Sequence, residues 1–356
     1  MGFESPFAAP SATNVYVPND ALAKMITVDF TRNPDDFTIN RYTQVIGNLP
    51  TKTGYYKRLQ PDQNARVRDT TFSLWPDGQP APSGAWNKKL FTNIFYETQR
   101  RVWPWEEGEQ TIDQSTIDWE VTYANMVGQQ SMTEQTELVI AALEAASWGT
   151  NQIDVGLYLN TELSTTGAYL DNGKDSEPHI KRVFGAAEVA IKLGTYSALK
   201  PSDLLFVCNP NTAFRLGLSQ EIHSYLGRSQ WSMDVLTGQT SQGIRDLFGL
   251  PPILYGHEVV VEDAAYEPTQ PGETRAPSFV LPDNVAYFVS RKGGLKGLAG
   301  RGTFSTVVRL FYGAENNYES RYDSWNKLYQ GRTWYDSQVQ VSSTLTGVRM
   351  VNLFAP

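Results

Sequence analysis

The sequence predicts an α+β fold, because segments with helical periodicity stand among segments with the spacing of strands. Apolar residues recur at helical spacing over residues 131–149 and again over 178–193. Apolar and polar residues alternate, as in a half-buried strand, over 94–100 and 117–123. A continuous apolar run, Leu204–Cys208, indicates a strand that is covered on both faces. At 356 residues, the chain has the length of two or three packed units.

The N-terminal part of the chain has few residues that can fill a core. Residues 1–35 spread four prolines among small polar residues without a clear period, which predicts an arm. Residues 41–86 are rich in glycine and proline, with short strand-like runs at Tyr42–Ile46 and Arg66–Leu74. We therefore expect a long two-stranded excursion that needs support from outside itself.

Both predicted helices carry end signals. The first is expected to begin at Ser131, because Ser131 and Glu134 have the S-x-x-E spacing of a capping box. Gly149 fits the position that follows the end of this helix. The second helix is expected to have Pro178 in its first turn and Gly194 just after its end.

After Pro201 the pattern changes to short helices and strands, which we expect to form a compact unit of about 100 residues. Asn209 and Pro210 provide an N-cap followed by proline at the first helical position. The helices expected in this unit reach Leu216, end at Gly227 and span Ser241–Phe248. The expected strands are Ile253–Tyr255, Glu258–Glu262, and a pair made by Phe279–Leu281 and Val285–Ser290. From Thr303 the chain alternates as further strands, with turns expected at Gly313, Gly331 and Gly347.

The composition excludes several classes of protein. One cysteine, Cys208, cannot form an internal disulfide, so a disulfide-stapled secreted scaffold is excluded. Three histidines and that cysteine are too few and too scattered for a zinc site. No apolar run approaches the roughly 18 residues that a membrane helix needs. The first ten residues lack the basic and apolar regions of a signal peptide, so we expect a soluble protein made in a reducing compartment.

The search for catalytic motifs finds no nucleophile elbow, phosphate-binding loop or zinc-protease motif. Glu221, His223 and Ser224 lie too close in sequence on a helix to form a triad among themselves. In the acid-rich segment 171–177, the glycine is not at the position that a calcium-binding loop requires. A loop that leads into a helix explains these acidic residues better. The glycine-rich segment 291–302 carries four cations. We interpret it as a mobile connector between domains, and the alternative is a weak contact with nucleic acid. We expect no catalytic, metal-binding or cofactor-binding residues.

The charge is distributed unevenly along the chain. The total is −8, yet residues 101–200 carry 15 Asp and Glu against 6 Lys and Arg. Opposite patches on one chain can steer copies of it together, although two solvated faces would give the same pattern. The basic residues are concentrated just before the acidic part, in the predicted excursion: Lys52, Lys57, Arg58, Arg66 and Arg68.

Four segments carry a resemblance to a known family. Phe95–Arg101 followed by Trp103–Trp105 looks like a strand returning from an extended loop, and Ser131–Thr133 looks like the entry to a long helix. Phe206–Thr212 and Leu247–Gly256 look like a strand with its following helix and a Phe-Gly turn before another strand. In this order, over about residues 35–350, they resemble the major capsid protein of tailed phages, with the Hong Kong 97-like fold.

The resemblance implies a division of the chain into an arm, an extended β-hairpin loop, a spine helix within a peripheral domain, and an apical domain. The expected segments are an N-terminal arm at 1–47, the extended loop at 48–93, the peripheral domain with the spine helix at 94–195, the apical domain at 196–299, and return strands of the peripheral domain at 300–356. The five basic residues of the loop are then expected to contact a neighbouring subunit.

The resemblance also implies a function in assembly rather than catalysis. The chain is expected to form hexamers and pentamers of an icosahedral virion shell that encloses double-stranded DNA without reading its sequence, assembled in the host cytoplasm. Its partners would be itself, a separate scaffolding protein, a portal and cement proteins, with no membrane and no cofactor. The net charge of −8 also disfavours avid binding of nucleic acid. The alternatives are an encapsulin-like nanocompartment shell and, from a different class, a soluble aromatic-rich glycan-binding protein.

Overall fold

A computed structural model describes most of the chain between residues 36 and 355. The described ranges are 36–49, 55–56, 79–80, 87–96, 119–197, 199–226, 250–268, 274, 276–290, 305–312, 317–323 and 328–355. Several sequence-based expectations lie outside them: the arm at 1–35, the strand at 66–74, Trp103–Trp105, the helix at 241–248 and the glycine-rich segment 291–302.

The chain divides into two compact units, each built from several stretches of sequence. The smaller unit comprises Met1–Asp36, Asn87–Met132 and Ala314–Asp336, and the larger unit comprises Phe37–Trp86, Thr133–Gly313 and Ser337–Pro356. Two elements, helix α5 (Trp119–Ala145) and strand β14 (Leu328–Val341), pass from one unit into the other. In the smaller unit, β13 (Asn317–Asp323) pairs antiparallel with the first half of β14. Strand β4 (Asn87–Tyr96) also pairs with β14.

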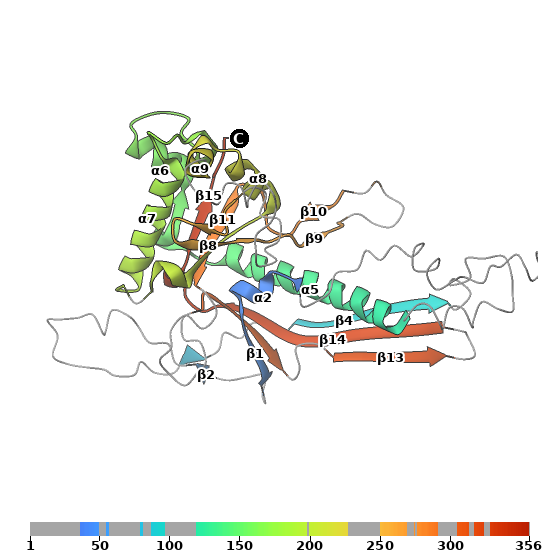
Figure 1. Ribbon diagram of the computed structural model, residues 1–356. Coiled ribbons are helices and arrows are strands. Elements are labelled where there is room, and N and C mark those ends of the chain that lie inside the picture. Colours follow the sequence, from blue (N-terminus) through green and yellow to red (C-terminus); the bar gives the residue numbers. More distant parts are fainter. Residues whose placement is uncertain are drawn as a thin grey trace, which may run out of the picture. The chain divides into compact units, whose positions relative to one another are not determined.

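The larger unit is organised around a six-stranded sheet (Figure 1). Its strand order is β5-β15-β11-β6-β8-β7, so the last strand in the sequence lies inside the sheet. Strands β6 and β8 are parallel, whereas β11 is antiparallel to both β6 and β15. The strands are β5 (Gln152–Asp154), β6 (Leu204–Cys208), β7 (Ile253–Leu254), β8 (His257–Val261), β11 (Val285–Ser290) and β15 (Val348–Val351).

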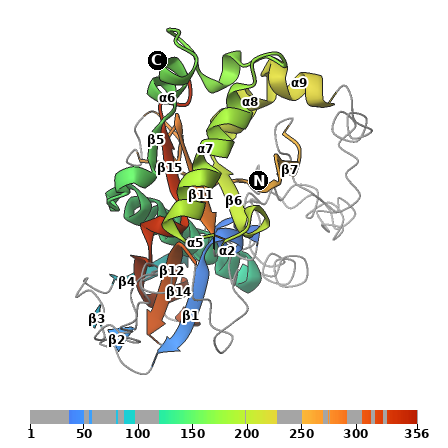
Figure 2. The same ribbon diagram turned by 90° about the vertical axis from the view of Figure 1, so that its left-hand side faces the viewer.

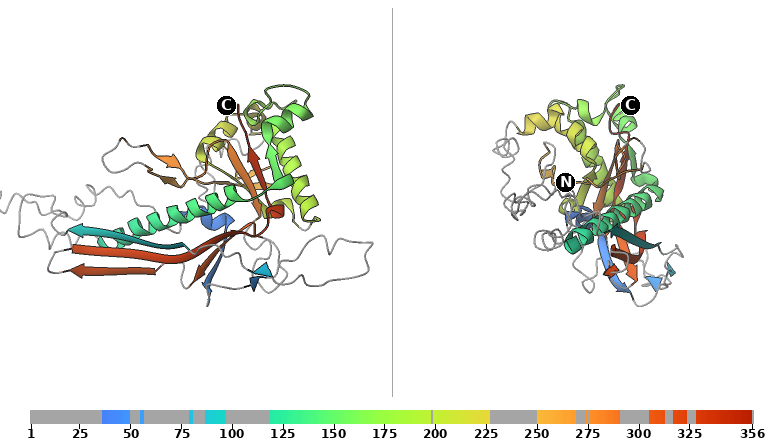
Figure 3. Two further views of the ribbon diagram at one scale, coloured as in Figure 1. Left: turned by 180° about the vertical axis from the view of Figure 1, so that it is seen from behind. Right: turned by 90° about the vertical axis from the view of Figure 1, so that its right-hand side faces the viewer.

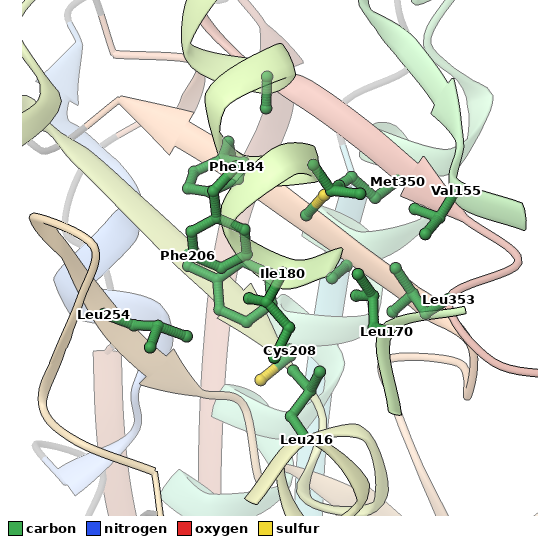
Figure 4. Packing of buried hydrophobic residues seen from close by; sticks show 14 of the residues in the cluster. Val155, Leu170, Ile180, Phe184, Phe206, Cys208, Leu216, Leu254, Met350 and Leu353 are labelled. Carbon is green, nitrogen blue, oxygen red and sulfur yellow. The ribbon is translucent and has the colours of Figure 1, made fainter. Parts of the chain in front are cut away.

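Helices pack on one face of this sheet (Figures 2 and 4). Phe184 of α7 stacks against Phe206 and Phe288 with ring centroids 4.9 Å away in each case. Alternate residues of β6, β8, β11 and β15 complete the same hydrophobic cluster. The helices of the unit are α6 (Val155–Glu162), α7 (His179–Gly194), α8 (Pro210–Gly217) and α9 (Gln220–Leu226).

The opposite face of the sheet is buried as well. Leu205 and Val207 of β6 are no more than 1% exposed, and Tyr287 of β11 lies 5.9 Å from the ring of Trp148, just after α5. The expectation that Leu204–Cys208 is covered on both faces is therefore confirmed. Cys208 is a buried free thiol, and burial raises its pKa.

The remaining elements of the larger unit form smaller groupings. Strand β1 (Gln44–Leu49) runs parallel to β12 (Val307–Tyr312), which pairs antiparallel with the second half of β14. Two short antiparallel pairs are β2 (Tyr55–Tyr56) with β3 (Gln79–Pro80) and β9 (Ala265–Tyr266) with β10 (Ser278–Phe279). The short helices are α2 (Ile39–Tyr42) and the 3-10 turns η3 (Gly149–Asn151), η4 (Leu170–Asn172), η5 (Pro201–Asp203) and η6 (Thr344–Thr346).

The core of the larger unit joins segments that the sequence analysis assigned to different domains. Figure 3 shows from behind how α7 and the six-stranded sheet lie together. Helix α7 falls in the segment 94–195, strands β6, β8 and β11 in 196–299, and β15 in 300–356, yet one hydrophobic cluster contains residues of all three. These segments therefore fold as one unit, through long-range strand pairing.

Several expected element boundaries are wrong. The long helix begins at Trp119, so Ser131 lies inside it rather than capping it, and the strand expected over 117–123 is mostly helix. Alternation over so few residues fits a helix as well as a strand, and no proline interrupts residues 119–131. Gly331 lies within β14, opposite Ser320, rather than at a turn. Strand β10 pairs with β9 and not with β11.

Other expected boundaries are confirmed. Asn209 is the N-cap of α8, where its side chain accepts a hydrogen bond from the Thr212 N–H at 2.7 Å. The second helix spans His179–Gly194, with Pro178 as its N-cap and Gly194 as its last residue, one position from the expectation at each end. Helix α9 ends at Leu226, as the glycine at 227 predicts.

Gly347, between η6 and β15, is predicted to tolerate no side chain. A Cβ atom there would lie 2.5 Å from the carbonyl oxygen of Phe288, so the backbone would have to move. Gly347→Ala is expected to lower the free energy of unfolding by about 2–3 kcal/mol, measured by urea denaturation. Gly185→Ala is the control: its Cβ would meet nothing within 4 Å in the middle of α7, so a gain of roughly 0.5–1 kcal/mol is expected. Equal effects at both glycines would contradict the steric explanation.

Candidate assembly site

The predicted contact residues Lys52, Lys57, Arg58, Arg66 and Arg68 lie outside the described residues. The described part of the same segment is a two-stranded pair, with Tyr55 opposite Pro80 and Tyr56 opposite Gln79. The extended loop expected at 48–93 stays a prediction.

An acidic counterpart to the predicted basic loop is visible on α5. Glu137, Ala141 and Glu144 are exposed and follow one another at helical spacing, so they form one face of the helix. This face borders a hollow of about 600 Å³ whose opposite wall is β10 and the residues around it. The hollow therefore presents carboxylates to solvent beside apolar and hydroxyl groups, a surface suited to a cationic segment.

Two polar contacts join helix α2 to strand β8 and to the residue that follows it. Arg41 forms an ion pair with Glu258, and the Tyr42 hydroxyl donates a hydrogen bond to Glu262 Oε2 at 2.8 Å. The Glu262 carboxyl also accepts the Ala264 N–H at 3.1 Å. Because Tyr42 and Glu262 are both fully buried, this contact ties the segment that enters β1 to the six-stranded sheet.

A second polar cluster surrounds Arg309, whose side chain is 1% exposed. Its guanidinium donates hydrogen bonds to Thr43 Oγ1 at 3.0 Å, Gln135 Oε1 at 2.6 Å and Asn40 Oδ1 at 2.6 Å. These acceptors come from α2, the residue after it, and α5, while Arg309 lies on β12. One side chain thus links three elements of the larger unit.

Burial of Glu262 predicts a pH dependence of stability. Burial raises the pKa of this carboxyl above its ordinary value of 4.5. The folded protein therefore keeps the proton over a pH range in which the unfolded chain loses it. The stabilisation is complete below about pH 4.5 and is lost as the pH rises through the raised pKa. We expect the unfolding free energy of wild type relative to Glu262→Gln to fall over that range, measured by urea titrations at a series of pH values. A difference that rises with pH would contradict this.

The acid and histidine pair that the sequence analysis examined as a catalytic site has a structural role instead. Glu221 is fully buried, and its two carboxylate oxygens accept the backbone N–H groups of Ile180 at 2.9 Å and Lys181 at 3.0 Å. The Tyr255 hydroxyl donates to the same carboxylate. Glu221 thus caps the N-terminus of α7 from another helix, while His223 on α9 is exposed.

The acid-rich segment 171–177 also has a structural explanation. Asp171 forms an ion pair with Arg215 of α8 at 2.9 Å. Within the described residues, no group of three or more His, Cys, Asp or Glu side chains is placed to hold a metal ion. Among the helices that the structure describes, none has the length and apolar character to cross a membrane.

Sequence reasoning missed the Arg309 cluster and the contact between Tyr42 and Glu262. One signal was present: Val307, Arg309 and Phe311 occupy the same face of a strand, and the two apolar members predict that this face is buried. An arginine on a buried face needs several acceptors. The acceptors themselves are 174 to 269 residues away in the sequence, so nothing local identifies them.

Known proteins resemble this chain in structure but not in sequence. No family model and no curated protein matches it. A phage-related protein from Bordetella bronchiseptica is 10% identical and has a TM-score of 0.52, over 90% of this chain and 93% of its own. The mature capsid protein of bacteriophage PhiM1 is 9% identical, with a TM-score of 0.45 over 93% and 90%. The SrpI encapsulin from Synechococcus elongatus is 9% identical, with a TM-score of 0.44 over 88% and 85%.

The match to the Bordetella protein shows a shared fold that extends over nearly all of both chains. The α+β class predicted from the sequence is therefore confirmed. Other solved structures that match include capsids of bacteriophage PhiM1 and of Staphylococcus phage Andhra, with TM-scores of 0.45 and 0.43. At such low identity the likeness defines an architecture, and the function is a separate question.

Proposed function

We propose that this chain is the major capsid protein of a tailed phage, which assembles into the hexamers and pentamers of an icosahedral shell around double-stranded DNA. The observation that carries the proposal is the fold shared with a phage-related protein over 90% of the chain. The antiparallel pairing of β2 with β3 and the uneven charge support self-assembly over catalysis. The location would be the virion shell, assembled in the host cytoplasm with scaffolding, portal and cement proteins as partners.

Electron microscopy of the purified chain tests this proposal. Closed shells, rings or tubes are expected when the protein is concentrated with the assembly proteins of its phage. A monomer of 39.8 kDa at high concentration under those conditions would contradict it. Nuclease-resistant DNA inside the particles is expected for a phage head, whereas a packaged enzyme would instead indicate a nanocompartment.

We propose further that the basic residues of the extended loop bind the acidic face of α5 on a neighbouring subunit. Glu137 and Glu144 are exposed on that face, and Lys57 and Arg58 follow β2 directly in the sequence. Each exposed ion pair contributes only about 0–1 kcal/mol. The total free energy of these contacts is large in a closed shell, because each subunit contributes its loop to one neighbour and its α5 face to another.

A charge exchange tests the loop contact. The pair Lys57→Glu with Arg58→Glu, and the pair Glu137→Lys with Glu144→Lys, are each expected to weaken assembly, measured by sedimentation. All four changes in one chain are expected to restore it, because opposite charges face each other again. Lys200→Glu, at an exposed lysine after α7, is the control. Failure of the fourfold variant to recover would show that these groups do not meet.

A further inference from the structure

A groove of about 1110 Å³ runs along the outer side of α7. The groove, called here the α7 groove, is lined on the helix by Ala186, Val189 and Leu193 and across from it by Tyr158 and Leu345. Val189 and Leu193 are 56% and 71% exposed, although they belong to a helix whose other face fills the core. Large apolar side chains exposed along a groove are typical of a surface that binds another protein.

A second apolar surface lies on α8, the helix that follows β6. Phe214 and Leu218 are 53% and 61% exposed and stand one helical turn apart. The exposed Asn211 comes one turn before Phe214 and donates a hydrogen bond to Asp283 at 3.1 Å. Phe214, Leu218 and Asp283 together are called here the α8 patch.

The α7 groove and the α8 patch are complementary in charge and in length. Along the groove, the exposed Val189 follows the exposed Lys181 by eight residues of the helix. On the patch, Leu218 follows Asn211, which lies beside the exposed Asp283, by seven residues. At 1.5 Å per residue, the charged and the apolar group are roughly 10–12 Å apart on each surface. When the two surfaces are laid together, Lys181 therefore meets Asp283 while apolar side chains meet apolar side chains.

We propose that the α8 patch of one subunit occupies the α7 groove of the next subunit within a ring. The inference rests on the proposed capsid function, because it identifies the faces through which copies of the chain meet. Two different faces of one subunit form the contact, so it is heterologous, and repetition of the same rotation closes a ring. Asp283 would then face Lys181, Phe214 would enter the groove beside Ala186, and Leu218 would lie beside Val189.

Two single substitutions at exposed positions test the contact in the full-length chain. Val189→Lys places a charge in the groove, and Leu218→Asp places one on the patch. Each is expected to reduce the population of rings at least about tenfold at a concentration at which wild type assembles, measured by native mass spectrometry. Leu157→Lys is the control, since Leu157 is 67% exposed on α6 and does not line the groove. Thermal midpoints equal to that of wild type show that each variant is folded.

Mixing the two variants gives the sharpest readout. In a ring in which the two variants alternate, every second contact joins an unchanged patch to an unchanged groove, and the contacts between join the new aspartate to the new lysine. An equimolar mixture is therefore expected to recover rings with even numbers of subunits. Assembly of both variants at the level of the Leu157→Lys control would overturn the α7–α8 contact and leave the capsid function intact. Loss of assembly without recovery in the mixture would also overturn it, since the two surfaces would then bind other partners. A wild-type chain that never assembles would overturn the capsid function and this contact together.

Discussion

Replacing Arg309 with leucine is expected to lower the free energy of unfolding by about 3–5 kcal/mol. The buried guanidinium donates to Asn40, Thr43 and Gln135, and leucine donates to none of them. Those oxygens would lose their hydrogen bonds to Arg309 away from water, where each such loss costs free energy. Urea denaturation of the purified chain measures the difference.

Two comparisons identify the origin of this cost. Arg309→Lys keeps the charge but cannot reach three acceptors from a planar group, so an intermediate loss is expected. Lys192→Met is the control on the surface, because Lys192 forms one exposed pair with Glu188 within α7. Its effect is expected to stay within about 0.5 kcal/mol. A leucine variant as stable as wild type would mean that the Arg309 cluster contributes nothing to the fold.

Removing the Glu221 carboxylate is expected to have the second largest effect. Glu221→Ala leaves the N–H groups of Ile180 and Lys181 and the hydroxyl of Tyr255 without their shared acceptor. The expected loss of unfolding free energy is about 2–4 kcal/mol, measured by thermal and urea denaturation. Hydrogen exchange of the first turn of α7 should accelerate, because that turn loses its cap.

Substitution at neighbouring positions separates this role from catalysis. His223→Ala changes an exposed residue of α9 and is expected to leave stability within about 0.5 kcal/mol of wild type. Glu221→Gln keeps one oxygen acceptor and is expected to fall between wild type and alanine. Equal stability of the Glu221→Ala and His223→Ala variants would show that the carboxylate does not support α7.

Local sequence signals predicted the elements of the larger unit better than their partners. The apolar run of β6 and the asparagine cap of α8 are properties of a few adjacent residues, and both are confirmed. The start of α5 was wrong by twelve residues because a plausible cap at Ser131 lies within a longer helix. The place of β15 between β5 and β11 depends on pairing across nearly 200 residues, which no local pattern contains.

The same contrast between local and long-range information applies to the candidate site. The charge pattern predicts a basic loop and an acidic segment, and the structure adds which carboxylates on α5 are exposed. The exposed apolar residues of α7 were hidden in the sequence, because Val189 and Leu193 resemble core residues until the helix is placed. The acceptors of Arg309 are set by the tertiary fold alone.

The interior position of β15 has a consequence for synthesis on the ribosome. During translation, β5 and β11 emerge before the strand that separates them, so the six-stranded sheet stays open until residues 348–351 are released. An open sheet exposes unpaired strand edges. A chain that lacks β15 therefore leaves the facing edges of β5 and β11 unpaired, whereas a chain that includes residues 348–351 covers both edges with one strand. Unpaired edges of this kind can pair with another chain, so the arrival of β15 removes a route to aggregation.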